Sequence, residues 1–504
     1  MPGSRILLAH SYYLKYDPKQ TRKMKPYPPL ATLHLAGYLR KLGHEVALFD
    51  AMLAEGEHAF AQALAGHRPD LVVLFEDNFN FLSKMCLTRM REAALNMVRL
   101  AAGQGRVVVA AGSDMSDHPE FYLDAGADAV AIGEGDHAVA EIAALISGPS
   151  PAALGADGRT QLLAGLESIP GLVFNRVPGG RAQTASRAPE RQPDRFGPPA
   201  WDLVDFGRYR EAWLAAHGRF SLNMASTRGC PFHCNWCAKP IWGQRYAMRN
   251  PAGVAEEMAT LCRIAQPDHI WFADDIFGLK PGWVADFGRE VNARGCRIPF
   301  TIQSRVDLMT PDAVEGLRLA GCEEVWLGAE SGSQHVLDAM DKGTSISDIH
   351  AARSRLRQAG IRASFFIQFG YPGEAWADIV ATLNLIATAA PDDIGVSVSY
   401  PLPGTRFHDM VRAQLGAKHN WSDSDDLAVL FEGAYPSEFY RALRDFAHLD
   451  HDARRADAPA LQARRDAAWA ELVSLEARLR SRAPTRLPGP GQPLAVPDLS
   501  LGWN

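Results

Sequence analysis

Short apolar runs alternate with amphipathic stretches over the first part of the chain. The runs lie at residues 5–9, 45–49, 71–75, 107–110 and 129–132. Runs of this length that are apolar on both faces and are separated by helical segments, such as residues 30–42, predict buried parallel strands with right-handed crossovers. Residues 1–147 are therefore predicted to form a doubly wound, Rossmann-like α/β domain with its ligand site at the carboxyl ends of the strands.

A second series of apolar runs begins near residue 221. Its runs lie at residues 222–225, 269–272, 300–303, 324–327, 364–369 and 394–400. Helical segments separate these runs, and polar or glycine-rich residues follow each of them. Such strand–helix repeats predict a full or partial parallel (β/α)6 barrel over residues 221–430, in which the loops after the strands form the active site.

Two other regions differ in composition. Residues 148–220 are rich in glycine, proline, alanine and arginine, and we interpret them as a linker in which residues 169–175 form a strand of a small hairpin. Residues 431–504 contain two predicted helices, at 438–448 and 458–482, and a proline-rich tail. The chain is thus predicted to hold two α/β domains, a linker and a helical C-terminal region.

Composition and charge narrow the classes of function. With 47% hydrophobic and 22% charged residues, the composition is that of a globular protein, which excludes wholesale disorder and collagen-like repeats. The 52 basic and 58 acidic residues leave a net charge of −6, so bulk attraction to nucleic acid or an anionic membrane is not expected. The sequence has no apolar stretch of transmembrane length and no signal-peptide pattern, so we expect a cytoplasmic protein.

Three of the seven cysteines fall within eight residues. Cys230, Cys234 and Cys237 have the spacing C-x3-C-x2-C in a segment without the periodicity of a core. Thiolates that converge from one loop select a soft metal or an iron–sulfur cluster. Structural zinc is the alternative, but it would need His233 as the fourth ligand, and the adjacent Cys234 makes that geometry awkward. In a four-iron cluster, three thiolates leave one iron open to a small molecule.

This motif resembles that of the radical S-adenosylmethionine (radical SAM) superfamily, because an aromatic residue, Trp236, precedes the last cysteine and the motif follows the first strand of a parallel barrel. The resemblance implies that Cys230, Cys234 and Cys237 hold a 4Fe-4S cluster and that SAM chelates the fourth iron. It also implies that an electron cleaves SAM to methionine and a 5′-deoxyadenosyl radical, which abstracts a hydrogen atom from the substrate. The protein then has to keep this radical dry and close to its target.

Polar residues after the later strands match the places where family members bind SAM. The resemblance implies that Asp274 or Asp275 accepts from the amino group, that a cation such as Arg305 meets the carboxylate, and that Glu330 accepts from the ribose. Each residue also has a structural alternative, such as a helix cap or a surface ion pair. The implied SAM contacts are Trp236, Asp274, Asp275, Gln303, Arg305, Glu330 and Ser331. Residues 370–374 and 401–405 resemble later loops of a subgroup that includes cobalamin enzymes.

The N-terminal domain resembles the cobalamin-binding domains that are fused to radical SAM barrels. The resemblance rests on residues 28–50, 112–114 and 127–136. One feature departs from other cobalamin enzymes: the segment Asp-x-His-x-x-Gly, which ligates cobalt through histidine, is absent. We therefore expect the lower face of cobalamin to meet another residue, water or nothing, unless the domain has kept the fold and lost the cofactor. The implied cobalamin contacts are Gly112, Ser113, Gly133 and Glu134.

These features lead to one main hypothesis and three alternatives. We predict a cobalamin-dependent radical SAM enzyme. Enzymes of this kind are most often methyltransferases, so we expect this one to methylate a carbon atom of a small-molecule substrate. We expect a flavodoxin- or ferredoxin-type protein to supply its electrons. The alternatives are a cyclase or oxidative rearrangement without methyl transfer, an RNA methylthiolase, and a non-enzymatic iron–sulfur or corrin sensing protein. The net charge and the lack of a second cysteine triad argue against the methylthiolase. No catalytic side chain is assigned.

Overall fold

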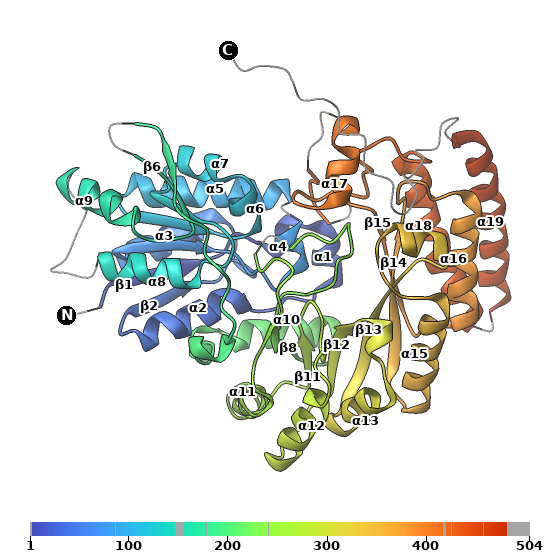
Figure 1. The fold of residues 1–504 in the computed structure, drawn as a ribbon. Helices are drawn as coiled ribbons and strands as arrows, with labels where there is room; N and C mark the ends of the chain where they lie inside the picture. The colour runs from blue at the N-terminus through green and yellow to red at the C-terminus, as the bar shows by residue number, and fades with distance from the viewer. Residues whose placement is uncertain are drawn as a thin grey trace.

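The structure is a computed structural model with two α/β units and a helical C-terminal region (Figure 1). It describes residues 3–85, 87–146, 156–176, 179–239, 241–416, 420–424, 426–456 and 458–480. The proline-rich tail predicted at the end of the chain lies outside these residues, as does Cys86. The predicted α/β class is confirmed.

The N-terminal unit is built on a seven-stranded sheet with the order β2-β1-β3-β4-β5-β6-β7. Its strands are β1 (Arg5–Ala9), β2 (Glu45–Phe49), β3 (Leu71–Phe75), β4 (Val107–Ala111), β5 (Ala129–Ala131), β6 (Leu172–Asn175) and β7 (Arg181–Gln183). The first five strands are parallel, whereas β6 and β7 join the sheet as an antiparallel hairpin next to β5. The hairpin predicted inside the linker therefore extends the first sheet.

Helices cover both faces of this sheet, as a doubly wound fold requires. In β1, Leu8 belongs to one hydrophobic cluster together with Leu33, while Leu7 belongs to a second cluster together with Leu64. Because successive strand residues point to opposite faces, the two clusters are the two layers beside the sheet. The helices are α1 (Pro18–Lys23), α2 (Leu30–Lys41), α3 (Glu57–His67), α4 (Phe81–Lys84), α5 (Thr88–Gly103), α6 (Ser113–Asp117), α7 (Pro119–Asp124), α8 (Asp136–Leu145) and α9 (Ala156–Leu166).

The second unit is a six-stranded, all-parallel sheet with the order β15-β14-β13-β12-β11-β8, which is the predicted partial barrel. Its strands are β8 (Ser221–Met224), β11 (His269–Phe272), β12 (Phe300–Ser304), β13 (Cys322–Glu330), β14 (Arg362–Phe369) and β15 (Ile394–Val398). A short antiparallel pair, β9 (Thr227–Arg228) and β10 (Ala247–Met248), follows β8. The helices are α10 (Phe206–His217), α11 (Pro251–Ile264), α12 (Trp283–Ala293), α13 (Pro311–Ala320), α14 (Gln334–Ala339), α15 (Ile346–Gln358), α16 (Trp376–Ala389) and α17 (Arg406–Val411).

Two long helices, α18 (Ser437–Arg455) and α19 (Pro459–Leu479), form the C-terminal region and pack beside α16 (Figure 1). Aromatic side chains join the three helices: the ring of Trp376 on α16 lies 5.7 Å from that of Trp469 and 6.3 Å from that of Phe439. The predicted helical C-terminal region is therefore confirmed. Within the described residues, no helix has the length and apolar character needed to span a membrane.

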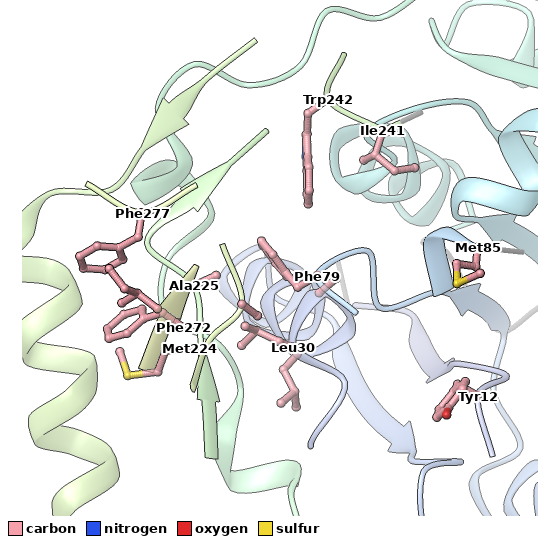
Figure 2. Packing of buried hydrophobic residues seen from close by; sticks show 14 of the residues in the cluster. Tyr12, Leu30, Phe79, Met85, Met224, Ala225, Ile241, Trp242, Phe272 and Phe277 are labelled. Carbon is pink, nitrogen blue, oxygen red and sulfur yellow. The ribbon is translucent and has the colours of Figure 1, made fainter. Parts of the chain in front are cut away.

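The two α/β units share one continuous hydrophobic core. Leu30 and Phe79 of the N-terminal unit belong to the same buried cluster as Met224 and Phe272 of the second unit (Figure 2). The rings of Phe79 and Trp242 lie 5.2 Å apart at this boundary. Because protein cores are close-packed, this shared cluster holds the two sheets in a defined relative orientation.

Substitutions at two helical glycines, Gly37 and Gly66, test how the linker packs on the first unit. A Cβ atom at Gly37 in α2 would lie 2.1 Å from the carbonyl oxygen of Pro198 in the linker, whereas a Cβ atom at Gly66 in α3 would meet nothing within 4 Å. Glycine to alanine inside a helix normally stabilises by about 1 kcal/mol. We therefore expect Gly66→Ala to stabilise the protein by about that amount, and Gly37→Ala to destabilise it by about 1–3 kcal/mol through overpacking. Thermal unfolding followed by circular dichroism measures both, and an equal stabilisation by the two variants would contradict the packing.

Candidate functional site

The three clustered cysteines lie on the loop between β9 and β10, directly after the first strand of the barrel sheet. All three are half-buried free thiols. Burial raises the pKa of Cys230, and it raises the pKa of Cys237 to about 12. The charge of Cys234 adds to both increases. The loop therefore gathers three thiols at the carboxyl edge of the barrel.

This donor set fits an iron–sulfur cluster. Thiolates are the ligands that such clusters use, and three of them come here from one short loop. In the described part of the chain, no three His, Cys, Asp or Glu side chains are arranged to hold a single metal ion.

Asp274 holds the beginning of the cysteine loop. Its buried carboxylate accepts hydrogen bonds from the backbone N–H groups of Ser226 (2.7 Å) and Thr227 (2.8 Å) and from the Ser226 hydroxyl (2.6 Å). Burial raises the pKa of Asp274 to about 6. The predicted contact of Asp274 with SAM would have to be made in addition to these three hydrogen bonds.

Asn235 holds the middle of the loop. Its side-chain N–H donates to the carbonyl oxygen of Ala339 at 2.7 Å, and its side-chain oxygen accepts from the Tyr371 hydroxyl at 2.8 Å. Its backbone N–H donates to the carbonyl oxygen of Met340 at 3.0 Å. Tyr371 follows β14, so the predicted cofactor loop at residues 370–374 contacts the cysteine loop through this hydroxyl.

A buried ion cluster ties the cysteine loop to the N-terminal unit. The guanidinium of Arg228 donates to the carboxylates of Glu134 and Asp136, with 3.3 Å to each oxygen of Asp136. The Arg228 side chain is 7% exposed, and its guanidinium carbon lies 4.4 Å from the centre of the Phe196 ring. Glu134 also accepts from the indole N–H of Trp242 at 3.2 Å. Glu134, a predicted cobalamin contact, therefore already binds two groups of the second unit.

Two buried cations, Arg305 and Lys342, lie near the cysteine loop. A terminal guanidinium nitrogen of Arg305 lies 3.8 Å from the Cys234 sulfur. The ammonium of Lys342 lies 2.7 Å from a carboxylate oxygen of Glu330 and 6.0 Å from the centre of the Trp236 ring. Although burial lowers the pKa of Lys342, the charges of Glu330 and Cys234 outweigh it, and the pKa is raised. Among the predicted site residues, Arg305 thus contacts the Cys234 sulfur, and Glu330 pairs with Lys342, whose ammonium lies near the Trp236 ring.

The other predicted SAM residues have different surroundings. Asp275 forms an ion pair with Lys84 of the N-terminal unit. Ser331 is buried, with its hydroxyl 3.1 Å from that of Thr382. Gln303 lies half-buried in β12, one residue before the end of the strand. Their contacts with SAM stay predictions.

The carboxyl edge of the first sheet carries buried polar atoms that lack a partner. Ser11, Asn78 and Ser113 follow β1, β3 and β4, and Ser83 lies in α4. A side-chain oxygen of each is buried and has no hydrogen-bond partner within the described residues. Buried polar groups normally find partners, so four orphans at one sheet edge fit a site that a polar ligand completes. Ser113 among them is a predicted cobalamin contact, and this edge fits the polar rim of a corrin.

The predicted glycines shape the same edge. A Cβ atom at Gly112 would lie 2.8 Å from the side chain of Glu76, which leaves no room for another residue. Gly133 adopts a φ of +73° and donates its N–H to the Ser116 hydroxyl at 3.0 Å. The close contact with Glu76 explains Gly112 and the positive φ explains Gly133, and the contacts of both glycines with cobalamin stay predictions.

Several site residues were not singled out from the sequence. His10, directly after β1, has its ring nitrogen 2.9 Å from a carboxylate oxygen of Asp50, whose other oxygen accepts from Tyr209 at 2.6 Å. Arg228 and Lys342 were also missed. The position of Arg228 directly before the Gly-Cys of the motif was an available signal, whereas nothing local marks Lys342, whose partner is twelve residues away.

Two family profiles match the chain. The profile described as B12 binding domain matches residues 25–143, and the profile described as Radical SAM superfamily matches residues 224–386. The first range contains β2 to β5, and the second contains the three cysteines and β11 to β14.

Known proteins resemble the chain over most of its length. An uncharacterized methyltransferase of Pyrococcus horikoshii is 24% identical over 78% of this chain and 81% of its own length. An anaerobic magnesium-protoporphyrin IX monomethyl ester cyclase of Rubrivivax gelatinosus is 24% identical over 78% of this chain and 67% of its own length.

Two solved structures share the fold. The cobalamin-dependent SAM radical enzyme OxsB has a TM-score of 0.67 and 14% identity, over 94% of this chain and 71% of its own. The radical SAM methyltransferase TsrM of Kitasatospora setae has a TM-score of 0.63 and 20% identity, over 81% of this chain and 76% of its own. Both the barrel and the N-terminal unit thus occur together in known structures.

The buried ion cluster of Arg228, Glu134 and Asp136 generates a prediction about the stability of the protein. Glu134→Gln removes one of the two carboxylates that neutralise Arg228 and leaves a buried charge less well compensated, so we expect a loss of about 3 kcal/mol in stability. Glu167→Gln, in the exposed pair with Arg176, is the matched control and should change stability by about 0.5 kcal/mol or less. Denaturant unfolding measures both variants, and a Glu134→Gln effect as small as that of the control would refute the role of the cluster.

Glu374 generates a prediction about pH. Burial raises its pKa to about 8, and one of its oxygens, like the hydroxyl of Tyr440, has no partner among the described residues. The folded protein holds this proton up to about pH 8, whereas an unfolded glutamate releases it near about pH 4.3. Stability should therefore fall between about pH 5 and 8 and level off above that, by an amount on the order of a few kcal/mol.

The variant Glu374→Gln tests this dependence. Glutamine keeps an acceptor for the N–H of Gly370, which lies 2.6 Å from the carboxylate, but it cannot titrate. We expect its stability to change less than that of the wild type between pH 6 and 8.5, measured by denaturant unfolding at several pH values. Identical slopes in the two proteins would show that Glu374 does not hold a proton in this range.

Proposed function

Because this chain belongs to the radical SAM superfamily and carries a B12-binding domain in front of its barrel, we propose that it methylates a carbon atom of a small organic substrate. It is an enzyme of the cobalamin-dependent radical SAM family, whose cofactors are a 4Fe-4S cluster, SAM and cobalamin. Methyl transfer is the part that we propose. A relative named as a methyltransferase matches 78% of this chain and 81% of its own length, and this supports the proposal.

The observation that carries the proposal is the ion cluster of Arg228 with Glu134 and Asp136. Arg228 lies two residues before the first cysteine, and the two carboxylates follow β5 at the carboxyl edge of the first sheet. The loop of the cysteines is therefore held against the edge that carries the unpartnered polar atoms. Two cofactor sites on one interface suit chemistry in which one cofactor activates a carbon atom and the other delivers a group to it.

Different residues of the chain have different roles in this proposal. Cys230, Cys234 and Cys237 would hold the cluster, and Ser11 and Ser113 would meet the polar rim of cobalamin. When bound, the cluster with SAM supplies hydrogen-atom abstraction from carbon, and cobalamin supplies a transferable methyl group. The protein keeps the cluster side of the site dry and its charges paired.

The surroundings of SAM form a second part of the proposal. Lys342 holds Glu330 in place at 2.7 Å, so that the remaining carboxylate oxygen can accept from a hydroxyl group. We place Glu330 and Ser331 at the ribose, Trp236 beside the cluster, and Asp275 and Gln303 at the amino acid end of SAM. We assign no side chain to proton transfer with the substrate.

An electron donor and a location complete the proposal. The cluster needs one electron from outside, and a flavodoxin- or ferredoxin-type protein is the donor class that fits this requirement. The sparse cysteines suit a reducing compartment, so we propose the cytoplasm.

The second candidate function is a ring closure or other oxidative rearrangement without methyl transfer. It is favoured by the relative named as an anaerobic cyclase, which, like the methyltransferase relative, is 24% identical over 78% of this chain. Both candidates use the same cofactors and differ only in whether the SAM methyl group is transferred.

The fate of the methyl group separates the two candidates. Anaerobically purified protein with a reconstituted cluster and cobalamin is incubated with dithionite and SAM that carries a labelled methyl group. A methyltransferase is expected to form both S-adenosylhomocysteine and 5′-deoxyadenosine, with label on the corrin. Formation of 5′-deoxyadenosine with no S-adenosylhomocysteine and no labelled corrin would favour the rearrangement.

A cysteine pair controls this experiment. We expect Cys234→Ala to lower 5′-deoxyadenosine formation by at least about 100-fold, because a cluster ligand is lost. Cys262→Ala, at a half-buried cysteine in α11, should keep activity near that of the wild type. Equal activity of the two variants would refute the assignment of the cluster loop, and a wild-type protein that binds no cobalamin would refute the proposed function.

A further inference from the structure

Arg305 is held rigidly at the cysteine loop from two sides. Its side chain is 8% exposed and follows β12. Two of its guanidinium nitrogens donate to the two carboxylate oxygens of Asp307, at 3.0 and 3.1 Å. The guanidinium carbon lies 3.7 Å from the centre of the Phe232 ring, so the planar group stacks on a residue of the cysteine loop.

The remaining terminal nitrogen of this fork is directed at a cluster ligand, since it lies 3.8 Å from the sulfur of Cys234. A fork held by a bidentate carboxylate and a ring stack loses little entropy when it forms one more hydrogen bond. The geometry is therefore that of a preorganised N–H donor to sulfur.

We propose that Arg305 is a positioning residue that donates a hydrogen bond to the Cys234 sulfur and thereby raises the reduction potential of the cluster. This inference rests on the proposed function, because it requires the cluster. Reduction adds one electron from an external reductant to the cluster, and no covalent bond forms or breaks. Hydrogen bonds to the sulfur ligands and nearby positive charge stabilise the more negative, reduced state.

The carboxylate partner of Arg305 does not cancel this effect at the sulfur. The Asp307 side chain is 34% exposed, so water screens its charge, whereas Arg305 is buried. The second cation near Cys234, Lys342, is paired with Glu330 while both side chains are 6% exposed. Lys342 thus directs its charge at Glu330, whereas Arg305 has a nitrogen within 3.8 Å of the Cys234 sulfur.

This assignment differs from the role that the sequence predicts for Arg305. As a partner of the SAM carboxylate, Arg305 would control the affinity for SAM and would leave the SAM-free cluster unaffected. As a donor to the Cys234 sulfur, it controls the potential of the cluster in the absence of SAM. The two roles can therefore be separated by experiment.

The test is a redox titration of the full-length protein with a reconstituted cluster and without SAM. The protein is titrated anaerobically with dithionite and mediators, and the reduced cluster is followed by electron paramagnetic resonance. We expect the midpoint potential of Arg305→Gln to be more negative than that of the wild type, with unchanged iron and sulfide content. Arg305→Lys keeps the charge but loses the fork, so we expect a smaller shift in the same direction. Arg318→Gln, at an exposed arginine paired with Glu315, is the control and should leave the potential unchanged.

The outcomes distinguish this inference from the proposed function. A wild-type protein that takes up no iron and sulfide would overturn the proposed function and this inference with it. A wild-type cluster whose potential is the same in Arg305→Gln would overturn the inference alone. Weaker binding of SAM by Arg305→Gln with an unchanged potential would also overturn it and would assign Arg305 to the SAM carboxylate. Should Arg305→Gln fail to fold, the potential of Arg305→Lys decides in the same way.

Discussion

The buried charge of Arg228 is the constraint on which the site depends. A guanidinium with 7% of its side chain exposed needs partners, because an unpaired charge in the protein interior is strongly destabilising. Its partners, Glu134 and Asp136, belong to the other α/β unit. Arg228, two residues before the first cysteine, is therefore compensated only when the two units are joined, and the ion cluster couples the start of the cysteine loop to the strand ends of the first sheet.

The shared hydrophobic core supports this coupling. Phe79 follows β3 and its ring lies 5.2 Å from that of Trp242, which donates to the same Glu134 that binds Arg228. Apolar packing and the ion cluster thus lie side by side at the boundary between the two α/β units. Two parallel sheets usually present their ligand sites at the carboxyl ends of their strands, and here the loops from both edges contact each other. A substrate between two cofactors would need such a shared edge.

Polar residues after strands serve two purposes in this structure. Asp274 accepts three hydrogen bonds that shape the start of the cysteine loop, and Glu134 holds Arg228 and Trp242. Ser11 and Ser113 also follow strands, but their buried oxygens have no partner in the described residues. Residues such as Asp274 and Glu134 therefore shape the site, whereas Ser11 and Ser113 are available to bind a ligand. Because both kinds have the same place in the sequence pattern, only their contacts separate them.

The sequence by itself determined the two parallel sheets, the partial barrel and the cysteine loop, because apolar periodicity and ligand spacing are local properties of the chain. The attachment of the β6–β7 hairpin to the first sheet was missed, since strand pairing depends on segments that are distant in sequence. The same holds for the site: Arg305 was identified as a cation near the cofactors, but its stacking on Phe232 and its direction toward Cys234 appear only in the folded chain. Lys342 carries no local signal, and His10 is marked only by its place directly after β1. Tertiary structure decided which polar residues bind one another and which are left for a ligand, because burial and partner distance are set by elements that meet only after folding.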